Sequence, residues 1–368
     1  MLLSSKRCRP TRSVVDEKDV TIPRVYSSLL WCNEFEGDPL EPGTPPTDSS
    51  ASGSSVYCLN AGGSSPSDQV KDVREVPMHN TERASAQVSR PISMEDVADC
   101  YQLSQSVSWS LRIEDWDFCI RLGQGIEISE NNRAIAAGLW WPYGAGYATM
   151  GLIMVAPNRQ GNGIGKRLMA QLLEQTGSRT RFLNSTAEEL PLYTRLGFIK
   201  IGYVRSYRGK SFNIPTPVLG EGQKLRPATQ DDWQVLFELD IQATGFPRRH
   251  ILESLFERGE TIVLEQAGKV LGFSILYRLG RGMVIGPVIA PGTREACFLI
   301  QNWMHSHWIY SEAGYPLKTT LPAGTGLDNW LIDHGFLLKV STTGMVEGIK
   351  PTMTGPSRQY AVIGQAFF

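Results

Sequence analysis

The stretch VAPNRQGNGIGKRLMAQLLEQ, residues 155–175, joins an apolar run to a helical pattern through a loop that contains three glycines. After the loop, Ile164, Leu168, Leu172 and Thr176 recur at helical spacing and would share one face. A glycine-rich loop before a helix is a typical phosphate site, because free backbone N–H groups and the helix dipole both attract an anion. The stretch therefore predicts a strand, a phosphate-binding loop and an amphipathic helix.

The glycine spacing distinguishes three kinds of phosphate loop. A nucleoside-triphosphate loop requires Ser or Thr after Gly-Lys, but Arg167 follows Gly165-Lys166. A dinucleotide fingerprint requires its third glycine one position later than Gly165. The third pattern, Gln/Arg-x-x-Gly-x-Gly/Ala, is met by Gln160, Gly163 and Gly165. This pattern places consecutive N–H groups and Lys166 around a pyrophosphate. The alternative is an ordinary glycine-rich turn, but glycines disfavour the helix that follows, so such a turn has no reason to contain three of them.

The patterns on either side of this stretch predict the surrounding elements. Order is expected from Val88, and Ser93 with Asp96 resembles a capping box that opens a helix. The segment GIEISENNRAIAAGLWWPYG is typical of two strands around a polar turn, and the apolar strand YATMGLIMVAP ends at Pro157. Helices are expected over 94–107, 114–122 and 164–176, followed by the strand RTRFLNST, a short helix that Gly197 closes, and the strand FIKIGYVRSYRG.

The second half of the chain repeats landmarks of the first in the same order. Arg90, Pro157 and Gly197 recur 136, 134 and 138 residues later as Arg226, Pro291 and Gly335. A nearly constant offset indicates duplication of a unit of about 130 residues. The Pro- and Gly-containing segment NIPTPVLGEGQ between the copies reads as a linker.

These patterns divide the 368 residues into four segments. Residues 1–84 are rich in Pro, Gly and Ser without periodicity, which predicts a disordered tract. Residues 85–212 form the first copy, 213–223 the linker and 224–368 the second copy.

Composition and charge exclude several classes of protein. The 36 basic and 37 acidic residues give a net charge of −1, which offers no argument for nucleic-acid binding. Six cysteines at 8, 32, 58, 100, 119 and 297 form neither a disulfide framework nor a metal motif, so no metal is expected. No apolar run is long enough for a membrane span. A cytoplasmic location is the resulting interpretation.

The loop, together with PLYTRLGF downstream, resembles the acyl-CoA binding motif and the Leu-Tyr-x-x-Leu-Gly-Phe segment of the GCN5-related N-acetyltransferases (GNAT). The resemblance covers about residues 88–209, and LWWPYGAGYATMGLIMVAP and FSILYRLGRGMVIGPVIAP are similar to the tandem YitH-like subgroup. It implies an α/β fold of two tandem GNAT domains, each a mixed, largely antiparallel sheet flanked by helices. It also implies acetyl-CoA as co-substrate.

The resemblance assigns cofactor-binding roles to individual residues. The strand from Ile153 to Val155 would pair with the pantetheine arm, and Pro157 would end that pairing. Asn184 is either a contact to that arm or a turn former at a strand end. The implied cofactor-binding residues are Ile153, Val155, Gln160, Gly161, Asn162, Gly163, Ile164, Gly165, Lys166 and Asn184.

Tyr193 stands where the family often has the tyrosine that protonates the departing thiolate, and packing under the sheet is its alternative role. A phenol pKa near 10 suits a thiolate pKa of about 8–9. Thr149 stands about where some members have a glutamate base. A water relay is therefore expected, with Glu114, Asp115 and Asp117 as relay candidates or as solvated helix residues.

The resemblance also bears on the acceptor and on the second copy. An acceptor cleft suited to an apolar or aromatic amine would be lined by Trp109, Trp140, Trp141 and Tyr143. The alternative is that these residues pack against the sheet. The second copy has no glycine loop after Pro291. At the position that corresponds to Tyr193, the second copy has Leu331. Both differences predict a degenerate second copy.

The sequence thus predicts transfer of an acetyl group from acetyl-CoA to a primary amine by direct attack in a ternary complex. A small-molecule acceptor is favoured, with no nucleic acid or membrane partner. The alternatives are a non-catalytic CoA-binding sensor or scaffold and a protein-lysine acetyltransferase. The oligomeric state is left open.

Overall fold

The computed structural model describes residues 86–209, 214–306 and 314–368. The tract expected to be disordered lies outside these residues, as does the start of the linker. Within the described ranges, no helix combines the length and the apolar character that crossing a membrane requires.

The first half contains the expected elements in the expected order. Ser93 and Asp96 form the capping box, and Asn131 and Asn132 both take positive φ in a tight hairpin turn. Gly197, at φ +94°, follows the short helix as a left-handed cap. The elements are β1 Gln87–Pro91, η1 Met94–Asp96, α1 Val97–Ser106, α2 Ile113–Leu122, β2 Gln124–Glu130, β3 Arg133–Tyr143, β4 Tyr147–Val155, η2 Pro157–Arg159, α3 Ile164–Thr176, β5 Thr180–Ser185, α4 Leu190–Arg195 and β6 Ile199–Gly209.

The second half repeats this order. Thr229 and Asp232 form a capping box at the position of Ser93 and Asp96. The elements are β7 Gln223–Pro227, η3 Gln230–Asp232, α5 Trp233–Thr244, α6 Arg249–Arg258, β8 Glu260–Gln266, β9 Lys269–Leu279, β10 Gly282–Ala290, α7 Thr293–Ser306, β11 Leu317–Pro322, α9 Asp328–Asp333, β12 Leu337–Glu347 and β13 Arg358–Ala361.

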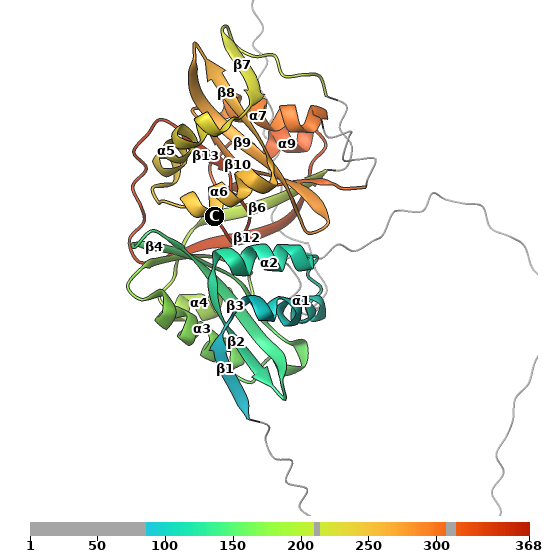
Figure 1. Cartoon of the computed structure of the whole chain (residues 1–368), viewed down its shortest axis with the longest axis vertical. Helices are drawn as coiled ribbons and strands as arrows, with labels where there is room; N and C mark the ends of the chain where they lie inside the picture. The colour runs from blue at the N-terminus through green and yellow to red at the C-terminus, as the bar shows by residue number, and fades with distance from the viewer. Residues whose placement is uncertain (1–85, 210–213, 307–313) are drawn as a thin grey trace, which may run out of the picture.

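The two halves share one sheet because each contributes a strand to the other. Among the described residues this sheet has 13 strands, in which β12 lies between β5 and β6, and β6 lies between β12 and β11. These contacts are antiparallel. The α/β class and the mixed, largely antiparallel sheet are confirmed. The sequence suggested a separate sheet for each domain, whereas the exchanged strands join the two sheets into one (Figure 1).

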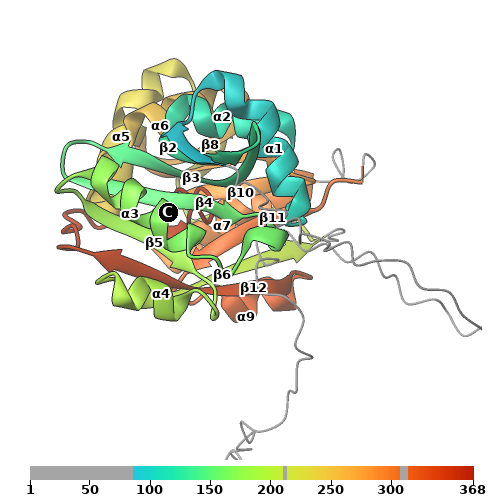
Figure 2. The ribbon, with the colours of Figure 1, turned by 90° about the horizontal axis from the view of Figure 1, so that it is seen from below.

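Helices cover both faces of the sheet. On one face, α1 and α2 of the first half and α5 and α6 of the second contribute to a single apolar cluster. On the other face, α3 and α4 cover one cluster and α7 and α9 cover another. Figure 2 shows α4 and α9 on the same side of β12, opposite α2, α5 and α6. The first face therefore provides a core common to both domains.

Candidate active site

Two adjacent parallel strands separate in the first domain. β4 and β5 pair only over 147–149 and 180–182, and beyond these residues β4 continues to Val155 without β5 beside it. Leu152 takes φ +51°, opposite a register shift in β3, so a bulge bends β4 at this point. A bulky residue rarely takes this backbone conformation, so the surrounding structure must hold Leu152 in it. The separation leaves a strand edge available for a ligand.

The glycine loop lies between η2 and the start of α3. Gly161 and Gly163 take φ +79° and +76°, which glycine adopts at little cost. A Cβ built on either would have no heavy atom of the described residues within 4 Å, so the space over both glycines is open. The first bond of the helical turn runs from the Arg167 N–H to the Gly163 carbonyl at 3.1 Å. The N–H groups of residues 161–166 therefore remain available to an anion.

A cavity of about 300 Å³ connects the loop with the gap between β4 and β5. It crosses the sheet, because Val107 and Trp109 lie at the face that carries α1 and α2, whereas Ile164 and Tyr193 lie at the face that carries α3 and α4. The other lining residues are Met150, Gly151, Leu152, Ile153, Met154, Val155, Arg159, Gln160, Gly161, Gly163, Gly165, Met169, Leu183, Asn184, Thr186, Glu188, Glu189, Leu192 and Thr342. Thr342 belongs to β12, so the second domain contributes to this cavity.

Most of the cofactor-binding residues expected from the sequence line this one cavity. The exceptions are Asn162 and Lys166, whose side chains are exposed at its rim. The Asn162 side chain donates to the Arg159 carbonyl at 3.2 Å and thereby braces the loop. Gln160 donates to the Val155 carbonyl at 3.1 Å, which ties the loop to the end of β4.

Tyr193 lines the cavity from α4 and is buried. Burial, and after it the charge of Glu189, raises the pKa of the Tyr193 phenol well above its usual value. The phenol is therefore protonated at neutral pH. Glu189 lies one helical turn before Tyr193, and burial raises the pKa of its carboxyl group too. Sequence reasoning missed Glu189, although the four-residue spacing from Tyr193 was a usable signal.

Three of the four aromatic residues assigned to an acceptor cleft lie elsewhere. Trp140 faces α3 and donates to Gln175 at 3.0 Å, whereas Trp141 faces the other side and donates to the Cys119 carbonyl at 3.0 Å. Consecutive strand residues point to opposite faces, and neither tryptophan is among the residues that line the cavity. Tyr143 is fully buried in the core shared by the domains. Only Trp109 lines the cavity.

The residues considered for a proton relay also lie outside the cavity lining. Glu114 is exposed, and half-buried Asp117 pairs with Arg121 at 2.8 Å. Asp115 is fully buried but accepts from Arg112 at 2.5 Å and from the Gly280 N–H of the second domain at 2.8 Å. Asp115 therefore joins the two domains rather than facing a substrate.

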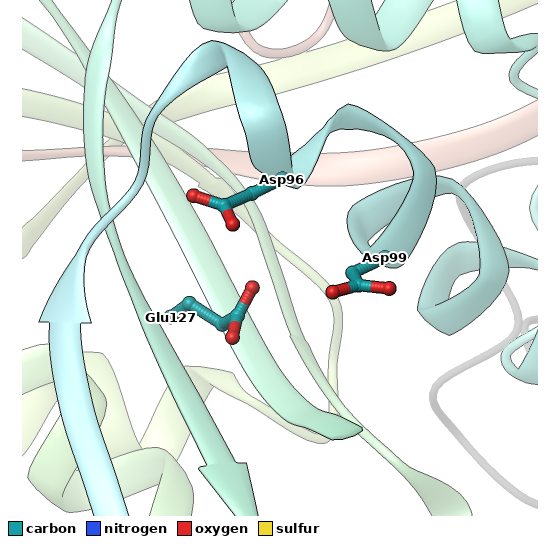
Figure 3. Close-up of side chains that lie close together, drawn as sticks. All are labelled: Asp96, Asp99 and Glu127. Atoms are coloured by element: carbon teal, nitrogen blue, oxygen red, sulfur yellow. The ribbon is translucent and has the colours of Figure 1, made fainter. Parts of the chain in front are cut away.

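Figure 3 shows a second group of acidic residues, Asp96, Asp99 and Glu127, whose ligand atoms lie within 4.8 Å of one another. Arg90 already supplies a cation there, with bonds of 2.6 Å to Asp96 and 3.2 Å to Glu127. In the second domain, Arg226 makes the equivalent 2.8 Å bond to Asp232 and also contacts a glutamate of the next strand. The repetition indicates a structural tie between the first strand and first helical turn of each domain.

The second domain differs at each point that defines the cavity. Between β10 and α7 there are only Pro291 and Gly292, so no glycine loop intervenes. β13 pairs antiparallel with β10, and the Val362 N–H donates to the Thr320 carbonyl of β11 at 2.9 Å. The chain itself thus fills the gap between β10 and β11. Leu331 is fully buried at the position that corresponds to Tyr193.

Comparison with known proteins agrees with this architecture. Two protein-family models, each described as an acetyltransferase (GNAT) domain, match residues 125–200 and 236–361. The chain therefore belongs to the GNAT acetyltransferases and carries two such domains in tandem, as the sequence motifs implied.

Individual relatives extend this finding. The chain is 29% identical over 192 residues to YitH, an uncharacterised N-acetyltransferase of Bacillus subtilis. The match covers 51% of this chain and 65% of YitH, somewhat less than two thirds of that relative. A putative acetyltransferase from Pyrococcus horikoshii has a similar fold, with a TM-score of 0.62 and 19% identity over 77% of this chain and 96% of its own. A tandem GNAT protein from the clavulanic acid biosynthesis pathway gives a TM-score of 0.56 and 13% identity, covering 73% and 100%.

Proposed function

We propose that the first domain transfers an acetyl group from acetyl-CoA to a primary amine by direct attack in a ternary complex. The observation that carries the proposal is the single cavity that joins the glycine loop, the free edge of β4 and Tyr193. These are the features that a thioester donor needs: a pyrophosphate site, a strand edge for the pantetheine amides and a proton donor.

The chain's own residues divide these tasks. N–H groups around Gly163 and at the start of α3 bind the pyrophosphate, while Ile153 and Val155 offer backbone groups to the pantetheine arm. The acceptor nitrogen attacks the thioester carbon, the carbon–sulfur bond breaks, and Tyr193 protonates the thiolate. A proton lost by the nitrogen then returns to Tyr193, giving the amide and CoA thiol.

The acceptor in this proposal is a small molecule. Acetyl-CoA takes the part of the cavity at the glycine loop and the β4 edge, which leaves the acceptor the part on the side away from α3. Val107 and Trp109 bound it on the side away from α3, so an amine with an apolar body suits it better than a lysine on a protein surface. The second domain, in which the chain fills the corresponding gap, supports the first without binding CoA.

The test is a transfer assay with labelled acetyl-CoA and a pool of small amines, read as the compound that gains the label. The proposal expects labelled amide together with a stoichiometric amount of released thiol. Tight CoA binding without transfer to any amine would contradict it and favour a CoA-binding sensor. Transfer only to protein lysines would contradict the small-molecule acceptor.

A further inference from the structure

Residues 364–368, the crossing segment, run from the second domain into the core of the first. Within this segment, Ala366 and Phe367 are each only 2% exposed, and Gln365 is 8% exposed. The Tyr277 hydroxyl donates to the carbonyl of Ile363, directly before the segment, at 2.5 Å. The proposed mechanism assigns no role to these buried residues.

The crossing segment holds two lining residues of the cavity. The Gln365 carbonyl accepts a hydrogen bond of 2.5 Å from Asn184 Nδ2. A Cβ built on Gly151 would lie 2.7 Å from Ala366 Cβ, so Ala366 lies directly against β4 where it separates from β5. Both Gly151 and Asn184 line the cavity. The crossing segment therefore lies directly behind two residues of the cavity wall and is not itself part of the lining.

The bond to Gln365 also fixes the orientation of the Asn184 amide. Because a carbonyl can only accept, Nδ2 must face it and Oδ1 must face away. Asn184 Oδ1 is buried and has no hydrogen-bond partner among the described residues. A buried acceptor without a partner is costly, so a ligand N–H in the cavity would stabilise it.

Phe367 anchors the crossing segment. Its ring lies 4.5 Å from Trp141, centroid to centroid, and its carbonyl accepts from the Tyr143 hydroxyl. Fully buried Arg248, paired with Asp240 at 2.8 Å, donates to the same carbonyl at 3.4 Å. Two of the aromatic residues assigned to an acceptor cleft from the sequence, Trp141 and Tyr143, thus pack against this segment.

We propose that the crossing segment closes the acceptor end of the cavity and limits the size of the amine that reaches the thioester. The glycine loop and α3 take the donor end, so the acceptor approaches from the face that carries α1, α2 and the crossing segment. This inference rests on the acyl transfer proposed above and assigns part of its specificity to the second domain.

The test compares Phe367→Ala with Phe336→Ala, which removes an equally buried ring from the separate cluster under α7 and α9. Released CoA thiol is measured with methylamine, butylamine and phenethylamine, and without amine. The Phe367→Ala variant should raise kcat/KM for phenethylamine relative to methylamine by about tenfold or more. Without amine, it should hydrolyse acetyl-CoA faster, as water attacks the thioester and yields acetate and CoA thiol. Phe336→Ala should leave the ranking unchanged.

Two further measurements keep the test independent of folding and of turnover. Ala366→Gly removes a single methyl group at the cavity end and should shift the ranking in the same direction, by less. Hydrogen–deuterium exchange should rise at residues 151–154 in Phe367→Ala but not in Phe336→Ala, while CoA affinity is retained in both.

The outcomes separate the two proposals. A wild-type chain that neither binds CoA nor releases thiol would overturn the proposed function, and this inference with it. A wild-type chain that is active, combined with Phe367→Ala and Ala366→Gly variants that keep its amine ranking and its exchange at 151–154, would overturn the crossing-segment proposal alone.

Discussion

Tyr193 is protonated throughout the physiological range, because burial and the neighbouring Glu189 both raise the pKa of its phenol. Replacing it with Phe keeps the ring in its packing, 6.0 Å from Phe198, and removes only the proton donor. We expect Tyr193→Phe to lower kcat by about 10²-fold or more with little change in CoA affinity. Steady-state kinetics and calorimetric titration measure the two quantities. An unchanged kcat would exclude Tyr193 as the acid.

Asp232 shows how the repeated Arg–Asp tie contributes to stability. The Arg226 side chain lowers the pKa of this carboxyl from 3.8 to about 2, because it stabilises the charged form. A lowered folded-state pKa gives stability that is present above about pH 4 and is lost as the pH falls toward 2.

Asp232→Asn should therefore lower the free energy of unfolding at neutral pH by about 1–2 kcal/mol. The difference from wild type should shrink as the pH falls through this window, which urea unfolding at several pH values can follow. Asp231→Asn, at the exposed neighbouring position, serves as the control. A difference that is independent of pH would contradict the electrostatic explanation.

The conformation of the glycine loop depends on residues that adopt the left-handed backbone region. An alanine at Gly163, where φ is +76°, would be strained by about 1–2 kcal/mol. Without ligand, the loop of this variant can relieve the strain by adopting another conformation. CoA binding must then restore the strained conformation, so we expect CoA affinity to fall by about tenfold. Gly165→Ala is a matched control, because Gly165 is helical and a Cβ there would lie 3.7 Å from Val155, an ordinary contact. Equal affinities in the two variants would contradict the role of the loop conformation.

The elements of the chain were predictable from local signals. The hairpin at Asn131–Asn132, the capping box at Ser93 and the stripe on α3 each follow from residues close in sequence. The loop residues of the site followed for the same reason. The strand exchange did not, because β6 and β12 carry no local mark of whether each pairs within its own copy. The role of the crossing segment beside Asn184 also depends on contacts between residues 181 positions apart.

At the scale of the molecule, the exchange of β6 and β12 makes each domain depend on the other. Without β12, strands β5 and β6 of the first domain would lose the strand that joins them. Without the second half, the face that carries α1 and α2 would also lose the residues of α5 and α6 that complete its core.

We therefore expect a fragment of residues 86–212 to show no cooperative unfolding transition on its own. The full chain should unfold in a single transition that is the same by fluorescence and by circular dichroism. Co-expression with residues 213–368 should restore the folded first domain. A fragment that folds alone and binds CoA would contradict this coupling.

We propose that only the first of the two GNAT domains holds CoA. Calorimetric titration of the full chain with CoA tests this proposal, because it gives affinity and stoichiometry together. We expect one CoA bound per chain, with an affinity that falls in Gly163→Ala. Two bound per chain, or one whose affinity Gly163→Ala leaves unchanged, would contradict it.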